Sequence, residues 1–368
     1  MKKNSWIILA LITVLTTACG TSGGTSADGN STEKESLEAQ NEAKVEGNSF
    51  ANDFIEMTIP SEFDGICRVE NEPDRLSVIY KEGEDAGYGG LEFYVWVREV
   101  TPDYAGGPQI KIGELVSADG KDYDVVVGYP SEVQWDFNKS YSMPEDYKRI
   151  ADAEKDICNT IQAVNGATYK AGAGIHGEDL YGDVLDKYVK AVSEGWDANK
   201  LEEEKMSPQF YEVATFSEGN AGDRIGFAYL DVNLDGVDEL FVGEIAEGDF
   251  KGVVYDIYTV VNRQPQLVVS GSARNRYFVY DNAFIVNEYS GGAAESGSMV
   301  YNLDYNTTEM TLQWGTKYDG YENEAQPWFI TYDGEEWENV TEEDYNNRVA
   351  DTSKYVRFDH TPLSSLAK

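Results

Sequence analysis

One acidic run in the second half of the chain has residue types and spacing suited to a hard cation. Two aspartates and an asparagine alternate with other residues, a glycine follows, and a glutamate closes the run. Calcium takes six to eight oxygen ligands at about 2.3–2.6 Å, which alternate positions of a short loop can supply. The glycine allows the sharp turn that such a loop needs. The predicted ligands are the side chains of Asp231, Asn233, Asp235 and Glu239 and the backbone carbonyl of Val237.

The segments that flank this run are rich in β-branched and aromatic residues, which predicts two strands at 226–230 and 239–243. An EF-hand instead joins two helices and has a glutamate at its twelfth position, where this chain has Val242. The run therefore resembles the FG-GAP loop of integrin-α propellers, with Glu239 in place of the usual final aspartate. That resemblance implies a structural calcium ion. The alternative is a solvated acidic β-turn without metal.

The N-terminus has the pattern of a signal peptide. Two lysines precede an apolar run over residues 6–15, which is too short to span a membrane. Cys19 follows small residues and resembles the cysteine of a bacterial lipobox, which implies removal of residues 1–18 and lipidation of Cys19. Two acyl chains would anchor the protein stably at the extracytoplasmic face of the cell membrane. The alternative is a secreted protein cleaved near Ala18.

The charge balance of the chain excludes some partners. The sequence has 29 Lys and Arg against 67 Asp and Glu, for a formal net charge of −38. Nucleic-acid binding needs a basic surface that displaces counterions, so we expect no nucleic-acid partner. Electrostatic attachment to anionic lipid is disfavoured for the same reason. An acidic surface suits divalent cations instead.

Hydrophobic patterning predicts an α+β fold with two domains, each an antiparallel β-sheet or meander with one or two packed helices, after a disordered tether. An amphipathic helix over residues 144–163 should close the first domain, and another over 178–193 should open the second. The predicted segments are a signal peptide at 1–18, a tether at 19–49, an α+β domain at 50–165, a linker at 166–177 and a β-rich domain at 178–368 that carries the calcium loop.

Two cysteines remain in the first domain once Cys19 is assigned to lipidation. Cys67 and Cys158 each lie on the apolar face of a predicted element, in a compartment that allows disulfides. A bridge between them is possible, and two separate buried thiols are the preferred alternative.

Over most of residues 50–300, the chain resembles a broad group of Firmicutes surface lipoproteins of uncharacterised function. The resemblance rests on Ile59-Pro60, on the glycine-rich run 87–90 before a strand, on the Tyr-rich helix of the second domain, and on the acidic loop with its flanks. It implies membrane-anchored exposure and a structural calcium ion, and it supplies no substrate and no catalytic residues.

These observations predict a binding or adhesion module for a cell-surface glycan or protein, without enzymatic activity. The sequence has only two histidines, so a nucleophile has few candidate bases. One alternative is a cell-wall glycan hydrolase with paired carboxylates. Another is a solute-binding lipoprotein, although that architecture usually alternates strands and helices.

Overall fold

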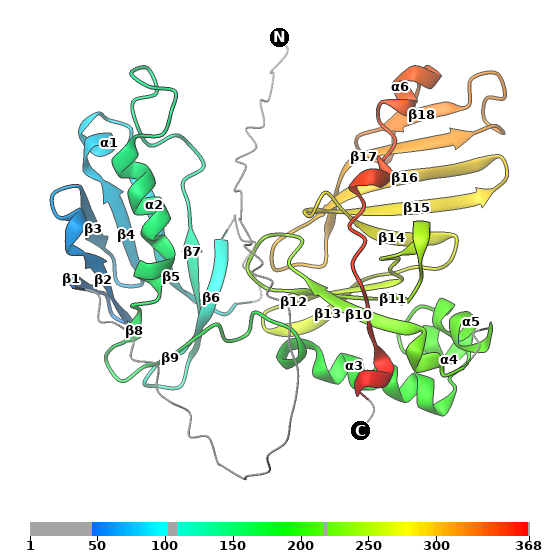
Figure 1. The fold of residues 1–368 in the computed structure, drawn as a ribbon, viewed down its shortest axis with the longest axis horizontal. Helices are drawn as coiled ribbons and strands as arrows, with labels where there is room; N and C mark the ends of the chain where they lie inside the picture. Colours follow the sequence, from blue (N-terminus) through cyan, green and yellow to red (C-terminus); the bar gives the residue numbers. More distant parts are fainter. Residues whose placement is uncertain (1–45, 102–108, 217–218, 367–368) are drawn as a thin grey trace, which may run out of the picture. The chain divides into compact units, whose positions relative to one another are not determined.

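The computed structural model describes residues 46–101, 109–216 and 219–366 (Figure 1). The predicted signal peptide, the lipidated Cys19 and the predicted tether up to residue 45 lie outside the described residues. Within the described ranges, no helix combines the length and the apolar character needed to cross a membrane.

Residues 46–171, here called the N-terminal lobe, contain two antiparallel sheets. The larger sheet has six strands in the order β3 (Cys67–Asn71), β4 (Arg75–Tyr80), β5 (Leu91–Glu99), β7 (Asp122–Gly128), β6 (Gln109–Val116) and β9 (Thr168–Ala171). The smaller sheet has the order β1 (Gly47–Ala51), β2 (Ile55–Pro60) and β8 (Gln162–Ala163). Short helical turns lie at η1 (Ser61–Phe63) and α1 (Lys81–Asp85).

Helix α2 (Glu145–Cys158) covers one face of the larger sheet (Figure 1). Two acidic residues in its first turn, Glu145 and Asp146, lie at the positive end of the helix dipole. Its apolar stripe packs into a core shared with β4, β5 and β7, which includes Tyr147, Ile150, Ile157, Phe93 and Val95. The helix is shorter than predicted because residues 162–163 leave it to pair with β2.

Residues 178–366, here called the C-terminal lobe, begin with α3 (Glu178–Glu194), α4 (Ala198–Glu203), α5 (Gln209–Phe216) and η2 (Ala221–Asp223). A five-stranded sheet has the order β13 (Gln264–Ser270), β12 (Asp256–Val261), β11 (Glu239–Glu244), β10 (Ile225–Leu230) and β20 (Thr361–Pro362). A six-stranded meander has the order β14 (Asn275–Tyr280), β15 (Phe284–Gly292), β16 (Glu295–Leu303), β17 (Met310–Asp319), β18 (Trp328–Thr331) and β19 (Glu338–Asn339).

The C-terminal segment, drawn in red in Figure 1, crosses the strands of this lobe. It contains α6 (Glu342–Asn346), η4 (Thr352–Lys354), β20 and η5 (Leu363–Leu366), and η3 (Gly248–Phe250) follows β11 earlier in the chain. Tyr355 forms a bridge with Tyr280 of β14, while Thr361 pairs with Phe227 of β10. Tyr355 and Leu363 are both buried in the same core as the helix α3. The last part of the chain therefore fastens to both sheets of the lobe.

The predicted fold class is confirmed, since every strand ladder is antiparallel and a few helices pack on the sheets. Two predicted boundaries differ from the structure. Strand β1 begins at Gly47, inside the predicted tether, and β9 lies inside the predicted linker 166–177. The Tyr169 ring of β9 lies against Gly113 of β6, where an added Cβ would lie 2.7 Å from the ring. Because Gly113 has no side chain, the Tyr169 ring can pack against β6, and the predicted linker segment joins the sheet as β9.

Candidate metal centre

The predicted hairpin forms, with β10 and β11 paired from Ile225↔Glu244 to Leu230↔Glu239. The loop between them turns with positive φ at Leu234 (62°) and Gly236 (83°). Glycine adopts this conformation readily, whereas the leucine does so at a cost. Leu234 is exposed, so packing does not explain its conformation. The hydrogen bonds of the loop supply the explanation.

Side-chain oxygens of the loop accept hydrogen bonds from its own backbone. Asp231 accepts from the N–H of Asp235 (3.1 Å, Oδ1) and of Gly236 (2.9 Å, Oδ2). Asn233 Oδ1 also accepts from the N–H of Asp235, at 3.1 Å. Asp235 Oδ1 accepts from the N–H of Val237 at 2.9 Å. These bonds wind the backbone around the three oxygen-bearing side chains and hold them on the inside of the loop.

Glu239 is fully buried at the start of β11. Its Oε2 accepts a hydrogen bond from the N–H of Val232 at 2.9 Å, and its Oε1 accepts one from Thr259 Oγ1 at 3.0 Å. The carboxylate therefore reaches back across the hairpin to the beginning of the loop. The longer arm of glutamate, compared with aspartate, makes this reach possible.

The pKa values of all three loop carboxyl groups are raised, chiefly by burial. Burial raises the pKa of Glu239 well above its ordinary value, and the negative charge of Asp235 adds to this. Burial raises the pKa of Asp235 to about 7, opposed by the N–H of Val237 and reinforced by Asp231. Burial also raises the pKa of Asp231. The positive charge of Arg98 acts in the opposite direction and lowers the pKa of Asp235 in part.

The predicted ligands therefore share one loop, but their oxygens are bound to N–H and hydroxyl groups. Among the described residues, no group of three or more His, Cys, Asp or Glu side chains is arranged as a metal site. The predicted set adds an amide oxygen of Asn233 and a carbonyl of Val237 to three carboxylates, so its donors are all oxygen, as a hard cation requires. The buried Nδ2 of Asn233 has no hydrogen-bond partner in the described residues, because Oδ1 faces the loop. The donor set is thus of the type that calcium binds. Calcium binding at this loop stays a prediction.

Asp238, which the prediction left out of the ligand set, faces away from the loop. Its Oδ2 accepts a hydrogen bond from the N–H of Gly177 at 3.2 Å and lies 3.2 Å from His176 Nδ1. Its backbone carbonyl accepts from the Tyr181 hydroxyl at 2.7 Å. This residue therefore attaches the hairpin to the start of α3.

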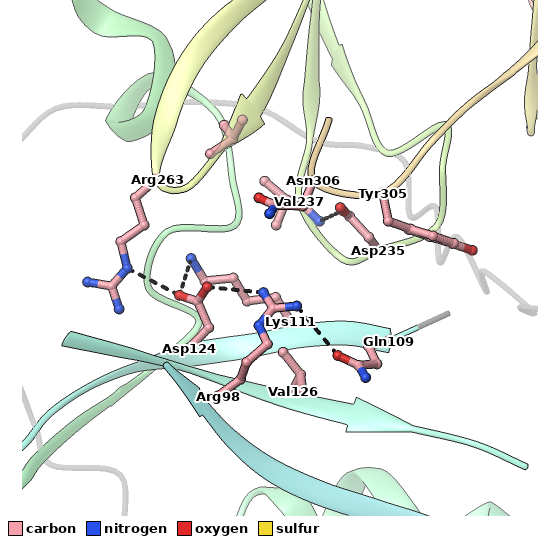
Figure 2. A pocket seen from close by; sticks show the side chains of 11 residues that line it. Arg98, Gln109, Lys111, Asp124, Val126, Asp235, Val237, Arg263, Tyr305 and Asn306 are labelled. Atoms are coloured by element: carbon pink, nitrogen blue, oxygen red, sulfur yellow. Dashed lines mark hydrogen bonds and ion pairs between the residues drawn. The ribbon is translucent and has the colours of Figure 1, made fainter. Parts of the chain in front are cut away.

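The tip of the loop contacts the N-terminal lobe, which the sequence did not predict (Figure 2). The N–H of Lys111, on β6, donates to the carbonyl of Asp235 at 2.7 Å. A Cβ on Gly236 would lie 2.7 Å from the carbonyl oxygen of Lys111, so only glycine allows this approach. Glycine is therefore required at position 236 for two reasons: the positive φ and the close approach of the Lys111 backbone.

Three cations surround Asp124 next to this contact (Figure 2). Arg98 lies 3.2 Å from Asp124, Lys111 lies 3.2 Å away, and Arg263 lies 3.1 Å away. Burial alone would raise the pKa of Asp124, but the attraction of Lys111, Arg263 and Arg98 lowers it. Arg263 comes from the turn between β12 and β13, so this cluster is a second link between the lobes. A small cavity between the cluster and the loop has a volume of about 40 Å³.

Cys67 and Cys158 are free thiols in the structure, so the possible disulfide is not formed. The two side chains face different surroundings. Cys67 contacts the carbonyl of Phe63 at 3.9 Å, whereas Cys158 lies near Glu154 and Tyr169. Burial raises the pKa of Cys67 to about 11 and that of Cys158 to about 12. The preferred alternative of two separate thiols corresponds to this arrangement.

Comparison with known proteins finds no matching family model, no similar curated protein and no similar solved structure.

Proposed function

We propose that the protein is a membrane-anchored, extracytoplasmic binding module whose acidic hairpin holds a structural calcium ion. The observation that carries this proposal is the loop of β10 and β11, where the buried Glu239 and the half-buried Asp231 and Asp235 lie together and only the charge of Arg98 acts against the raised pKa of Asp235. Buried charges of one sign are costly unless they are neutralised by protonation or by a counter-ion. A divalent cation offsets this cost with an all-oxygen ligand set.

The ion's role would be structural. The residues that would hold it are Asp231, Asn233, Asp235, the carbonyl of Val237, and Glu239. Ligands that surround the ion leave no open position for a substrate, so the site supports folding and not chemistry. Because the carbonyl of Asp235 accepts from Lys111, an ordered loop also supports the contact between the lobes.

The binding role rests on the sequence and remains a proposal. Lipidation at Cys19 would hold the protein at the outer face of the membrane, and the ligand would be a glycan or a protein at the cell surface. The acidic composition favours an extracytoplasmic surface rich in divalent cations and disfavours nucleic acid.

Calorimetric titration of the metal-free protein with calcium chloride tests the metal site. We expect one binding event per chain, and we expect Asp235→Asn to weaken the affinity at least tenfold, because it removes a charge at an almost unchanged shape. Glu324→Gln is the matched control, since Glu324 is exposed in the same lobe and has no hydrogen-bond or ion-pair partner among the described residues. Absence of heat from the unmodified protein would contradict the metal site.

Cell fractionation tests the anchor. We expect Cys19→Ser to move the protein from the membrane fraction into the medium. Retention of the variant in the membrane fraction would show that Cys19 is not the point of attachment.

A further inference from the structure

A groove in the C-terminal lobe lies between the six-stranded meander and the C-terminal segment. It has a volume of about 450 Å³, within the range of about 300–1,000 Å³ typical of small-molecule sites. Strands β14, β15 and β16 form its floor, and residues 345–355 form its wall. We refer to it as the Tyr-Arg groove. The residues that line it include Arg274, Glu288, Tyr289, Ser296, Tyr345 and Tyr355.

The wall of the groove is fixed in place. The Tyr355 hydroxyl donates to Glu288 Oε1 at 2.8 Å, and the N–H of Val356 donates to the carbonyl of Val279 at 2.9 Å. Arg276 binds the other oxygen of Glu288, with Nη2 at 2.8 Å and Nε at 2.9 Å. The groove is therefore formed before any ligand arrives, which reduces the ordering cost of binding.

Arg274 differs from its neighbour Arg276. It is exposed at the edge of the groove, and its guanidinium makes no hydrogen bond or ion pair with the part of the chain that the structure describes. The charges of Arg276 and Glu288 cancel, so among the charged residues that line the groove Arg274 is left without a counter-charge. A guanidinium is a fork-shaped donor that matches a carboxylate with two parallel hydrogen bonds.

Two carboxylates lie near the groove, and one of them, Asp319, is paired with Lys317 at 3.3 Å. Glu295 and Asp319 lie close enough to raise the pKa of Tyr289, after burial as the main cause. A ligand with several charges would be repelled by these carboxylates. A single carboxylate beside Arg274 is the charge that fits.

The rest of the lining suits a hydroxylated ring. Tyr289 and Tyr345 are partly exposed and supply aromatic faces with polar tips, and serines of β15 and β16 also line the groove. The hydroxyl groups of Tyr289 and Ser296 have no hydrogen-bond partner among the described residues. Gly297 lies opposite Tyr289 in the strand pair, and a Cβ there would lie 2.6 Å from the Tyr289 hydroxyl, so glycine makes room for this ring.

We propose that the Tyr-Arg groove binds a saccharide that carries one carboxylate. Arg274 pairs with the carboxylate, the rings of Tyr289 and Tyr345 contact the C–H face of the sugar, and the unpartnered hydroxyl groups of Tyr289 and Ser296 bind its hydroxyl groups. This inference rests on the proposed role as a binding module and names the ligand class and its location.

Calorimetry on the full-length protein in mild detergent tests the proposal with sodium glucuronate, glucose and sodium acetate as probes. We expect glucuronate to bind at least tenfold more tightly than either glucose or acetate, since only glucuronate has both the ring and the charge. Arg274→Ala should lower the affinity for glucuronate about tenfold and leave that for glucose unchanged. Lys139→Ala is the control, because it removes one exposed positive charge in the other lobe. A hyaluronan tetrasaccharide distinguishes the source: tighter binding than glucuronate identifies a glycan chain, and equal binding identifies the free sugar acid.

Two results would overturn the proposal. One is equal affinity of the unmodified protein for glucuronate and glucose, and the other is an unchanged glucuronate affinity in Arg274→Ala. Calcium titration of the same samples separates the two proposals. A normal calcium response without glucuronate binding would contradict the groove alone, whereas glucuronate binding without a calcium response would contradict the metal site alone.

Discussion

Each lobe contains carboxyl groups with raised pKa values, but the surroundings of these groups differ between the lobes. The hairpin of the C-terminal lobe surrounds Asp231, Asp235 and Glu239 with backbone N–H donors. In the N-terminal lobe, Glu92 of β5 is 5% exposed, and its Oε2 has no hydrogen-bond partner in the described residues. Burial, followed by the charge of Glu154, raises the pKa of Glu92 to about 9. Burial and like charge alone therefore do not distinguish a metal site.

The difference lies in the backbone. The hairpin loop curves around its side chains, so Asp231 Oδ1 and Asn233 Oδ1 both accept from the N–H of Asp235. Glu92 instead stands at a β-bulge, because Val78 pairs with Phe93 while Ile79 pairs with Leu91. It lies between a sheet and a helix, where Tyr129 already donates to Glu154 at 2.8 Å. We infer that the hairpin carboxylates are neutralised by a cation and Glu92 by a proton.

The largest expected difference between the two groups is in their response to calcium. Calcium at about one hundred times its Kd should stabilise the folded protein by about 2.7 kcal/mol. This corresponds to an increase in Tm of about 5–10 °C. Asp231→Asn should abolish the increase and Glu92→Gln should leave it intact, as measured by differential scanning calorimetry with and without chelator. An equal increase in Tm in both variants would show that Asp231 does not bind calcium.

Gly236→Ala should destabilise the protein by about 2 kcal/mol, because alanine is strained at positive φ and its Cβ would meet Lys111. Gly120→Ala is a matched control, since Gly120 has the same φ of 83° and no neighbour within 4 Å of an added Cβ. Gly120→Ala should lower the free energy of unfolding by about 1 kcal/mol, because only the backbone strain at positive φ remains. Chemical denaturation measures both. Equal costs would show that the contact with Lys111 does not limit this position.

Glu92→Gln should stabilise the N-terminal lobe by about 1–2 kcal/mol at pH 8, because it removes a buried carboxyl without a partner. The folded-state pKa of about 9 lies above the unfolded value, so the protonated form contributes stability below about pH 4.5 that is lost as the pH rises toward 9. The gain should therefore be smaller at pH 5 than at pH 8. Glu132→Gln, at an exposed position, should change neither value. A gain independent of pH would contradict protonation of Glu92.

The calcium affinity should fall about tenfold between pH 8 and pH 6, because the ion competes with the proton on Asp235, whose pKa is raised to about 7. In chelator the sign is opposite: the protonated loop is the more stable one, and its stability falls as the pH rises from about 4 to about 7. Calorimetric titrations at the two pH values measure the first effect. An affinity independent of pH would show that Asp235 is already ionised in the metal-free protein.

The sequence predicted the local features of this comparison. The spacing of Asp231, Asn233 and Asp235 predicted the turn, and the flanking apolar residues predicted the two strands that pair. Glu92 could not be assigned in advance, because its neutral state depends on a bulge set by pairing with β4 and on a helix far along the chain. The contact of Lys111 with Asp235 likewise joins residues whose proximity no local pattern encodes. The Tyr-Arg groove needs the C-terminal segment laid across β14 to β16.

The fastening of the C-terminal segment to both sheets has a consequence for synthesis of the protein on the ribosome. Tyr355 and Leu363 complete a core whose other members are translated much earlier, including Tyr188, Leu240 and Phe278. The nascent second lobe therefore keeps apolar surface uncovered until nearly the whole polypeptide has emerged, while the core of the first lobe is already complete. During that interval its uncovered apolar surface makes the unfinished lobe prone to aggregation.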